Sequence, residues 1–146
     1  MDKSVDKELA QKFWEISQEA YAYDSPWTAE QFASDLAQSH SHYFMESEEI
    51  AAFLGFHQVC DEIEITNIAT AVKGQGTGGK LMRRLIQYAK SQKIASIFLE
   101  VRASNHEARL FYGKFGFQVI GTRKKYYQHP TEDAVLMSLK VGNKDE

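Results

Sequence analysis

A run of glycines between Val72 and Leu81 constrains this chain more than any other feature. The run follows a β-like segment and precedes apolar residues at helical spacing, namely Leu81, Met82, Leu85, Ile86 and Ala89. The glycines are therefore expected at the N-terminus of a helix. The first N–H groups of a helix lack partners within it and the helix dipole is positive there, so this terminus favours an anion. We expect the loop to hold a phosphorylated ligand.

The glycine run fits three ligand-binding patterns, and the run alone leaves them open. Residues 74–79 match the G-x-G-x-x-G dinucleotide fingerprint, for which Glu100 on the next strand would be the ribose-binding acid. Residues 74–80 match a P-loop, but Leu81 stands where a Ser or Thr must hold magnesium, which disfavours a nucleotide triphosphatase. Residues 73–78 are similar to an acyl-CoA-binding loop that begins with Lys in place of Arg or Gln. A glycine-rich turn that binds nothing is the remaining interpretation.

The length and charge of the chain reduce the number of protein classes to which it could belong. With 146 residues it is expected to form one domain over residues 1–146, too short for a dehydrogenase with a separate substrate domain. Its formal net charge of -3 gives no basic footprint for nucleic acid. We therefore expect a small-molecule or protein partner rather than a nucleic acid.

Cysteine and histidine usage indicates neither a disulfide nor a metal site. Cys60 is the one cysteine of the sequence, which excludes an internal disulfide, and the five histidines lack partners at ligand spacing. No apolar run reaches the length of a membrane span or of a signal-peptide core. A cytoplasmic protein that binds no membrane and no metal is the expectation.

The order of elements predicts an α+β fold. Apolar spacing predicts a helix over 6–22, a second helix capped by Thr28 and Gln31, and a short helix around 108–115 that follows a capping box at Ser104. Alternation predicts strands over 43–45, 50–59, 63–70, 95–101, 117–127 and 134–141. Residues 142–146 are expected to be a disordered tail. A doubly wound nucleotide fold would instead alternate strand and helix throughout.

Two residues are candidates for chemistry. Glu100 lies on the strand face opposite Ile97, Leu99 and Val101, and a carboxylate in a mostly apolar strand is costly unless it is paired or used. It is interpreted either as an ion pair with Arg102 or as a general base. Tyr112 is interpreted either as a core residue of its helix or as a phenol that reaches a ligand.

Several further motifs resemble one family. They are Leu-Glu-Val-Arg-Ala-Ser-Asn at 99–105, Leu110–Phe117, Arg123–Tyr127 with Glu132–Ala134, Ile68-Ala69, and Pro26-Trp27-Thr28. Over almost its whole length the chain resembles the GNAT acetyltransferases that modify the N-terminal alanine of a small-subunit ribosomal protein. The resemblance implies a GNAT fold with a mixed, mostly antiparallel sheet flanked by helices. It also implies acetyl-CoA as co-substrate, no metal, and a protein N-terminus as acceptor.

The resemblance also assigns site residues. Glu100 would be the general base and Tyr112 the acid that protonates the leaving thiolate. Backbone groups for the pantetheine arm would come from Ile68, Ala69 and Thr70. The pyrophosphate would be wrapped by Gly74, Gln75, Gly76, Thr77, Gly78 and Gly79, and Asn105 would also contact the cofactor.

The chain departs from the family pattern in two places. About two residues, including a proline and an aromatic, are missing between the strand at 67–70 and the glycines, so the pyrophosphate loop is expected to be tighter. The first strand of the family is expected to be truncated. This leaves one sheet edge unprotected and would favour a weak homodimer.

Overall fold

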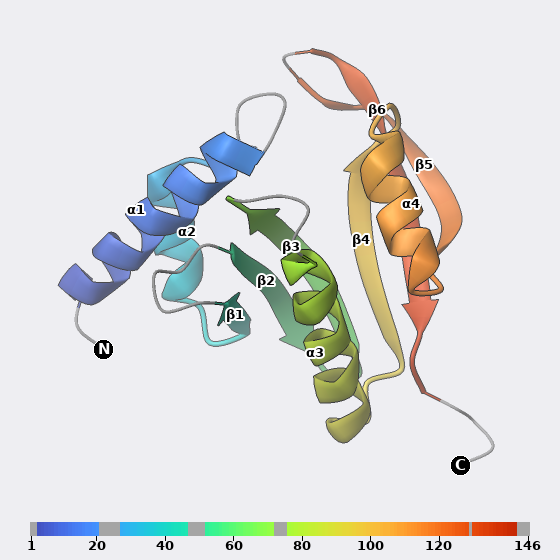
Figure 1. Cartoon of the computed structure of the whole chain (residues 1–146), viewed down its shortest axis with the longest axis horizontal. Coiled ribbons are helices and arrows are strands. Elements are labelled where there is room, and N and C mark those ends of the chain that lie inside the picture. Colours follow the sequence, from blue (N-terminus) through green and yellow to red (C-terminus); the bar gives the residue numbers. More distant parts are fainter. Residues whose placement is uncertain (1–2, 21–26, 47–51, 72–75, 129, 143–146) are drawn as a thin grey trace. The chain divides into compact units, whose positions relative to one another are not determined.

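The computed structural model describes residues 3–20, 27–46, 52–71, 76–128 and 130–142. In these ranges the elements are α1 Lys3–Ala20, α2 Ala29–Leu36, β1 Ser41–Glu46, β2 Ala52–Val59, β3 Glu62–Thr70, α3 Thr77–Ser91, β4 Ser96–Arg102, α4 His106–Lys114, β5 Gln118–Tyr127 and β6 Glu132–Lys140 (Figure 1). The strands are hydrogen-bonded in the order β1-β2-β3-β4-β6-β5. The β3–β4 pair is parallel, whereas β1–β2, β4–β6 and β5–β6 are antiparallel. The expected α+β fold with a mixed, mostly antiparallel sheet is confirmed.

The chain folds as two compact units. The first unit comprises residues 1–58 and 66–87, and the second comprises residues 59–65 and 88–146. Among the described residues, α1 is the first element and no strand precedes it. None of the described helices has the length and hydropathy needed to cross a membrane.

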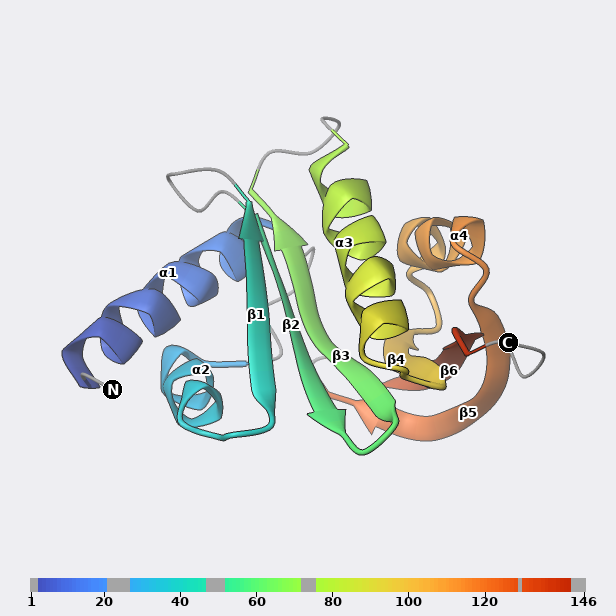
Figure 2. The same ribbon diagram turned by 90° about the horizontal axis from the view of Figure 1, so that it is seen from below.

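In the first unit, α1 and α2 cover one face of β1 and β2, and α3 covers the other (Figure 2). Phe13 of α1 stacks on Tyr43 of β1 and Phe53 of β2, with ring centroids 4.6 and 4.4 Å apart. The next residue of β1, Phe44, points to the opposite face, where the guanidinium of Arg84 on α3 lies 4.3 Å from its ring centroid. The two-residue period of the strand thus separates an aromatic core under α1 from the surface under α3.

A buried carboxylate ties α2 to the strands of the first unit. Asp35 is 8 % exposed and accepts hydrogen bonds from the hydroxyls of Ser41 and Tyr43, at 2.9 and 2.6 Å. His57 Nε2 lies 2.6 Å from the same carboxylate. Burial, then the hydrogen bond to Asp35 and its charge, raise the pKa of Tyr43. The phenol therefore stays protonated and holds its ring in place over β2.

In the second unit, α4 lies beside β4 and β6 (Figure 1). Three register pairs place apolar side chains on one face of β4 and β6, namely Ile97 with Leu139, Leu99 with Met137 and Val101 with Val135. Gly116 ends the α4 segment as expected: its φ is +99°, and a Cβ there would lie 3.2 Å from Leu139 Cδ1. A left-handed residue without a side chain therefore lets the chain turn from α4 into β5.

The sequence predicts one helix cap correctly and misplaces another. Gln31 N–H donates to Thr28 Oγ1 at 3.1 Å and Thr28 N–H donates to Gln31 Oε1 at 2.8 Å, so the predicted capping box of α2 is confirmed. The predicted box at Ser104 is wrong, because α4 is capped one residue later by Asn105, whose Oδ1 accepts from Ala108 N–H at 3.1 Å. The backbone N–H of Ser104 is instead held by a carboxylate of the turn between β5 and β6.

Gly55 is expected to be intolerant of a side chain. It pairs with Tyr43, and a Cβ there would lie 2.6 Å from Tyr43 Cε2. The ring cannot retreat without losing its bond to Asp35 and its stack on Phe13. Gly55→Ala should therefore lower the free energy of unfolding by about 1–3 kcal/mol, measured by denaturant titration.

The matched control is Gly113→Ala, because a Cβ at that position of α4 meets no atom within 4 Å. It should be neutral or stabilising by up to about 1 kcal/mol. Equal stabilities for the two variants would show that the Tyr43 ring can move aside.

Candidate functional site

The predicted anion site lies at the start of α3, in the first unit. α3 begins at Thr77, directly after Gly76, whose φ is +73°. Lys80 N–H donates to Gly76 O at 3.1 Å, so the N–H groups of Thr77, Gly78 and Gly79 precede the first bond of the helix. The predicted position of the glycines at a helix N-terminus is confirmed for these residues. Gly74 and Gln75 lie outside the described residues.

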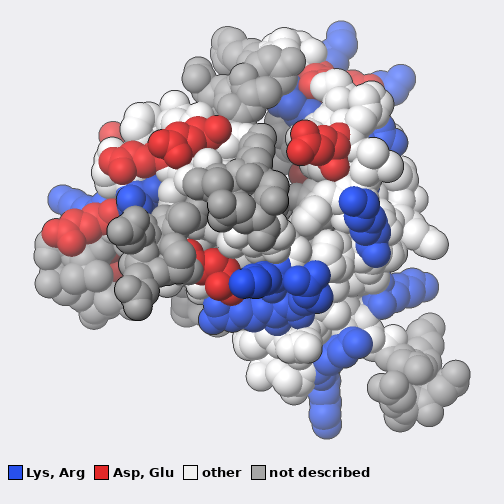
Figure 3. Space-filling view, in the orientation of Figure 1, with Lys and Arg blue, Asp and Glu red and all other residues white. Residues whose placement is uncertain are grey.

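The charge around this terminus suits an anion. The first turn of α3 has no acidic residue. Lys80 and Arg83 are exposed in its first two turns, and Figure 3 shows Lys and Arg side chains gathered where α3 lies. Added to the helix dipole, these cations favour the negative charge of a pyrophosphate.

The strand that precedes the loop ends with the three residues predicted to meet the pantetheine arm. Ala69 is buried against the aromatic cluster of α1 and α2, while Ile68 and Thr70 are half-buried. The first unit thus carries the described residues predicted to hold the cofactor, apart from Asn105. Asn105 belongs to the second unit, where its side-chain oxygen caps α4.

Glu100 points away from the apolar face of β4, as the alternation predicts. Its side chain is 17 % exposed, and its Oε1 lies 3.5 Å from Arg123 Nε on β5. Its Oε2 is buried and has no hydrogen-bond partner among the described residues. The ion pair that the structure gives Glu100 is with Arg123, while the guanidinium of Arg102 donates to two carbonyls of the turn between β5 and β6.

Arg123 and Tyr126, both on β5, complete the surroundings of Glu100. The Arg123 guanidinium lies 5.7 Å from the Tyr126 ring centroid. Burial, then the negative charge of Glu100 and a hydrogen bond to it, raise the pKa of Tyr126. The contacts depend on the register of β5, which no local pattern reveals.

Tyr112 lies on α4 and is 7 % exposed. Its ring packs edge-on to Phe111 at 5.4 Å and contacts Phe117 at 5.7 Å. This burial agrees with the core interpretation.

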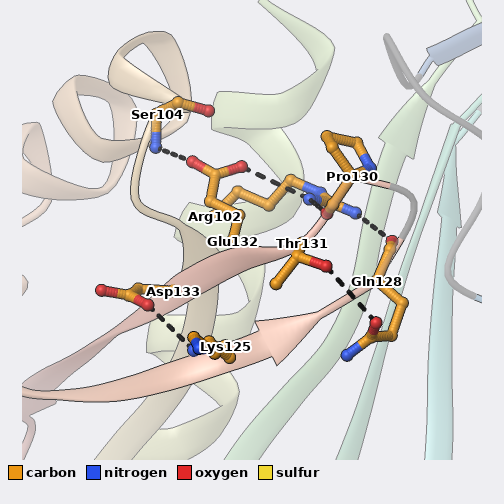
Figure 4. Close-up of polar contacts among 8 residues, drawn as sticks. All are labelled: Arg102, Ser104, Lys125, Gln128, Pro130, Thr131, Glu132 and Asp133. Atoms are coloured by element: carbon orange, nitrogen blue, oxygen red, sulfur yellow. Dashed lines mark hydrogen bonds and ion pairs between the residues drawn. The ribbon is translucent and has the colours of Figure 1, made fainter.

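Arg102 holds the turn between β5 and β6 (Figure 4). It donates to the carbonyls of Gln128 and Pro130 at 3.0 and 2.9 Å and pairs with Glu132 at 3.3 Å. Glu132 also accepts from Ser104 N–H at 2.5 Å. Hydrogen bonds from Ser104 and Arg102 lower the pKa of Glu132. One arginine and one carboxylate thus join the end of β4, the start of α4 and the β5–β6 turn.

A metal does not fit the described residues. Among them, no three His, Cys, Asp or Glu side chains are grouped as ligands.

Comparisons with known proteins agree with the motifs. Residues 7–117 match the model of the acetyltransferase (GNAT) family. A Bacillus subtilis (strain 168) protein, named provisionally as a ribosomal protein bS18-alanine N-acetyltransferase, is 38% identical over 129 residues, 85% of each chain. The ribosomal protein bS18-alanine N-acetyltransferase of Escherichia coli (strain K12) is 34% identical over 136 residues, 88% of this chain and 89% of the relative.

A solved structure of a relative of this kind is similar to the fold of this chain. The crystal structure of the Escherichia coli ribosomal-protein-S18-alanine N-acetyltransferase superposes with a TM-score of 0.82 at 32% identity. The match covers 92% of this chain and 88% of that one.

The Glu132 contact predicts a pH-dependent local stability. A lowered pKa in the folded state means that the contact stabilises the fold above the unfolded pKa near 4.5 and is lost as pH falls through the lower folded value. At pH 7, Glu132→Gln should reduce the hydrogen-exchange protection of the Ser104 amide on the order of tenfold. The difference from the unmodified protein should disappear in acid.

Thr131→Ala serves as the control for that measurement. Thr131 Oγ1 donates to Gln128 Oε1 at 3.5 Å within the same turn but does not contact Ser104 in the structure. Equal Ser104 protection in Glu132→Gln and the unmodified protein would contradict the role given to this carboxylate.

Proposed function

Since this chain belongs to the GNAT family of acetyltransferases, we propose that it transfers the acetyl group of acetyl-CoA to the N-terminal alanine amine of a small-subunit ribosomal protein. The observation that carries the proposal is the Glu100 carboxylate, with one oxygen paired and the other buried without a partner among the described residues. The acceptor is supported by the names of relatives that cover most of the chain.

The first unit is proposed to bind the cofactor. The N–H groups of Gly76, Thr77, Gly78 and Gly79 would donate to the pyrophosphate, in line with the positive end of the α3 dipole. The end of β3, at residues 68–70, would offer backbone groups to the pantetheine arm as a strand offers them to a neighbour. Gly74 and Gln75, and the side-chain amide of Asn105, are assigned to the same cofactor by resemblance.

The second unit is proposed to move the protons. Acetyl-CoA supplies the thioester, whose C–S bond breaks as the new C–N bond to the acceptor forms. Glu100 takes the proton that the α-ammonium must lose to become a nucleophile, and Tyr112 gives its phenolic proton to the leaving sulfur. An α-amine has a pKa near ~8, so a carboxylate base is sufficient at neutral pH.

Other expectations about partners stay predictions. They are a weak homodimer through an exposed sheet edge, a cytoplasmic location, and the absence of nucleic-acid and membrane partners. β1 and β5 are the edge strands of the sheet, which is where an edge-to-edge contact would form.

The acid and base roles predict a loss of turnover without a loss of cofactor binding. Glu100→Gln and Tyr112→Phe should each lower kcat by roughly 10²–10⁴, the usual range for general acid–base groups. Both substitutions keep side-chain shape, so the Kd for acetyl-CoA, measured by calorimetry, should change little. Near-normal kcat in both variants would mean that these residues serve the fold alone.

The acceptor assignment predicts selectivity for a free N-terminal alanine. A peptide that copies the ribosomal protein N-terminus should gain one acetyl group on its α-amine, read by intact and fragment mass spectrometry. The same peptide with a blocked N-terminus and free lysines should stay unmodified. The rate should rise with pH towards the α-amine pKa, because the neutral amine is the nucleophile. Lysine acetylation, or turnover with small amines alone, would assign this GNAT enzyme a different acceptor.

A further inference from the structure

Arg123 reaches Glu100 across an intervening strand. Glu100 on β4 and Gly121 on β5 both pair with Leu136 on β6, and Arg123 pairs with Ala134. Neighbouring strands lie about 4.8 Å apart, so β4 and β5 are separated by roughly 10 Å. Only a long side chain can span that distance, and the small Ala134 beside Arg123 leaves the path open.

An irregularity in β5 brings a second residue to the same place. The regular pairing of β5 with β6 breaks between Arg123 and Tyr127, where Lys125 has a φ of 52° and its N–H donates to Asp133 at 2.8 Å. Such a bulge shifts the alternation of the strand. As a result Tyr126 lies beside Arg123 and interacts with Glu100.

Three other strands contribute side chains to the face of the sheet on which Glu100 lies. β5 contributes the Arg123 cation and the Tyr126 phenol. β3 contributes the carboxylate of Glu64, whose register partner Phe98 lies on the Glu100 face of β4, and whose charge also reaches Tyr126. β6 contributes the uncharged Leu136. Arg123 and Glu64 act in opposite directions on the pKa of Tyr126: Arg123 lowers it and Glu64 raises it.

The position of the Arg123 side chain is not explained by burial in a core. Its side chain is 57 % exposed, yet its Nε is directed at one oxygen of a carboxylate that is 17 % exposed. The contact therefore fixes the orientation of the Glu100 carboxyl group.

We propose that Arg123 is a positioning residue of the acetyl-transfer reaction: it holds Oε1 of Glu100 so that the carboxylate keeps the orientation in which it receives the acceptor proton. The inference rests on the proposed function of Glu100 as the base. Arg123 itself exchanges no proton, since a guanidinium stays charged at any pH in the assay.

The test compares Arg123→Ala, Arg123→Lys, Glu100→Gln and the double variant Arg123→Ala/Glu100→Gln by steady-state kinetics from pH 5 to 9. Arg123→Ala should lower kcat about tenfold and leave the KM for acetyl-CoA unchanged at each pH. Arg123→Lys should recover part of kcat, because it keeps the charge but not the planar donor. In the Glu100→Gln background, Arg123→Ala should have no further effect, because it acts through the missing carboxylate.

Lys140→Ala is the control for a lost surface charge, since Lys140 is exposed at the far end of β6 from Ala134. It should retain kcat and the unmodified pH profile. Circular dichroism and thermal unfolding of each variant establish that it is folded, and Arg123→Lys covers the case in which Arg123→Ala is not.

Two outcomes overturn the proposal without touching the proposed function. In the first, the Glu100→Gln variant has a low kcat, but Arg123→Ala changes only the KM for the peptide. The other is a double variant slowed by the full product of the two single effects. A Glu100→Gln variant with normal turnover would instead refute the base assignment itself, and with it both claims.

Discussion

The second unit is organised by one constraint: a single strand, β4, must bury apolar side chains on one face and keep a carboxylate on the other. The apolar face, with Leu99 at its centre, continues onto β6 through the register pairs, and Glu100 lies on the opposite face with Oε2 removed from water. Taking a carboxylate out of water is costly without a counter-charge. The counter-charge comes from β5, which carries Arg123.

Two arginines, Arg102 and Arg123, contact different partners in the second unit. Arg102 has three oxygen acceptors from the β5–β6 turn, which use the planar fork of its guanidinium. These contacts connect the end of β4 to the β5–β6 turn. Arg123 is the ion-pair partner of Glu100. It lies directly before the bulge at Lys125, where the pairing of β5 with β6 changes register. The turn and the ion pair are thus linked, since an altered turn would shift the register on which the Arg123 contact depends.

The features that could be predicted from sequence are those encoded over a few consecutive residues. Alternation places Glu100 opposite Leu99, the Thr28–Gln31 spacing specifies a capping box, and the glycines mark the start of α3. The failures involve partners distant in sequence. Asn105 rather than Ser104 caps α4, and the Ser104 N–H donates to a carboxylate 28 positions away. The Asp35 cluster was likewise invisible, because it joins a helix residue to two strands.

The same distinction explains why the anion site could be predicted from the sequence, whereas the environment of Glu100 could not. An anion site at a helix N-terminus needs only a permissive glycine and a helix behind it, so the segment from Gly76 to Lys80 contains its whole physical basis. The environment of Glu100 needs three strands, a register shared through Leu136, and a bulge that reverses the facing of Tyr126. A one-residue slip of β5 would turn Arg123 to the other face of the sheet. The reactivity of the carboxylate is therefore a property of strand pairing, and the cofactor loop is a property of local chain geometry.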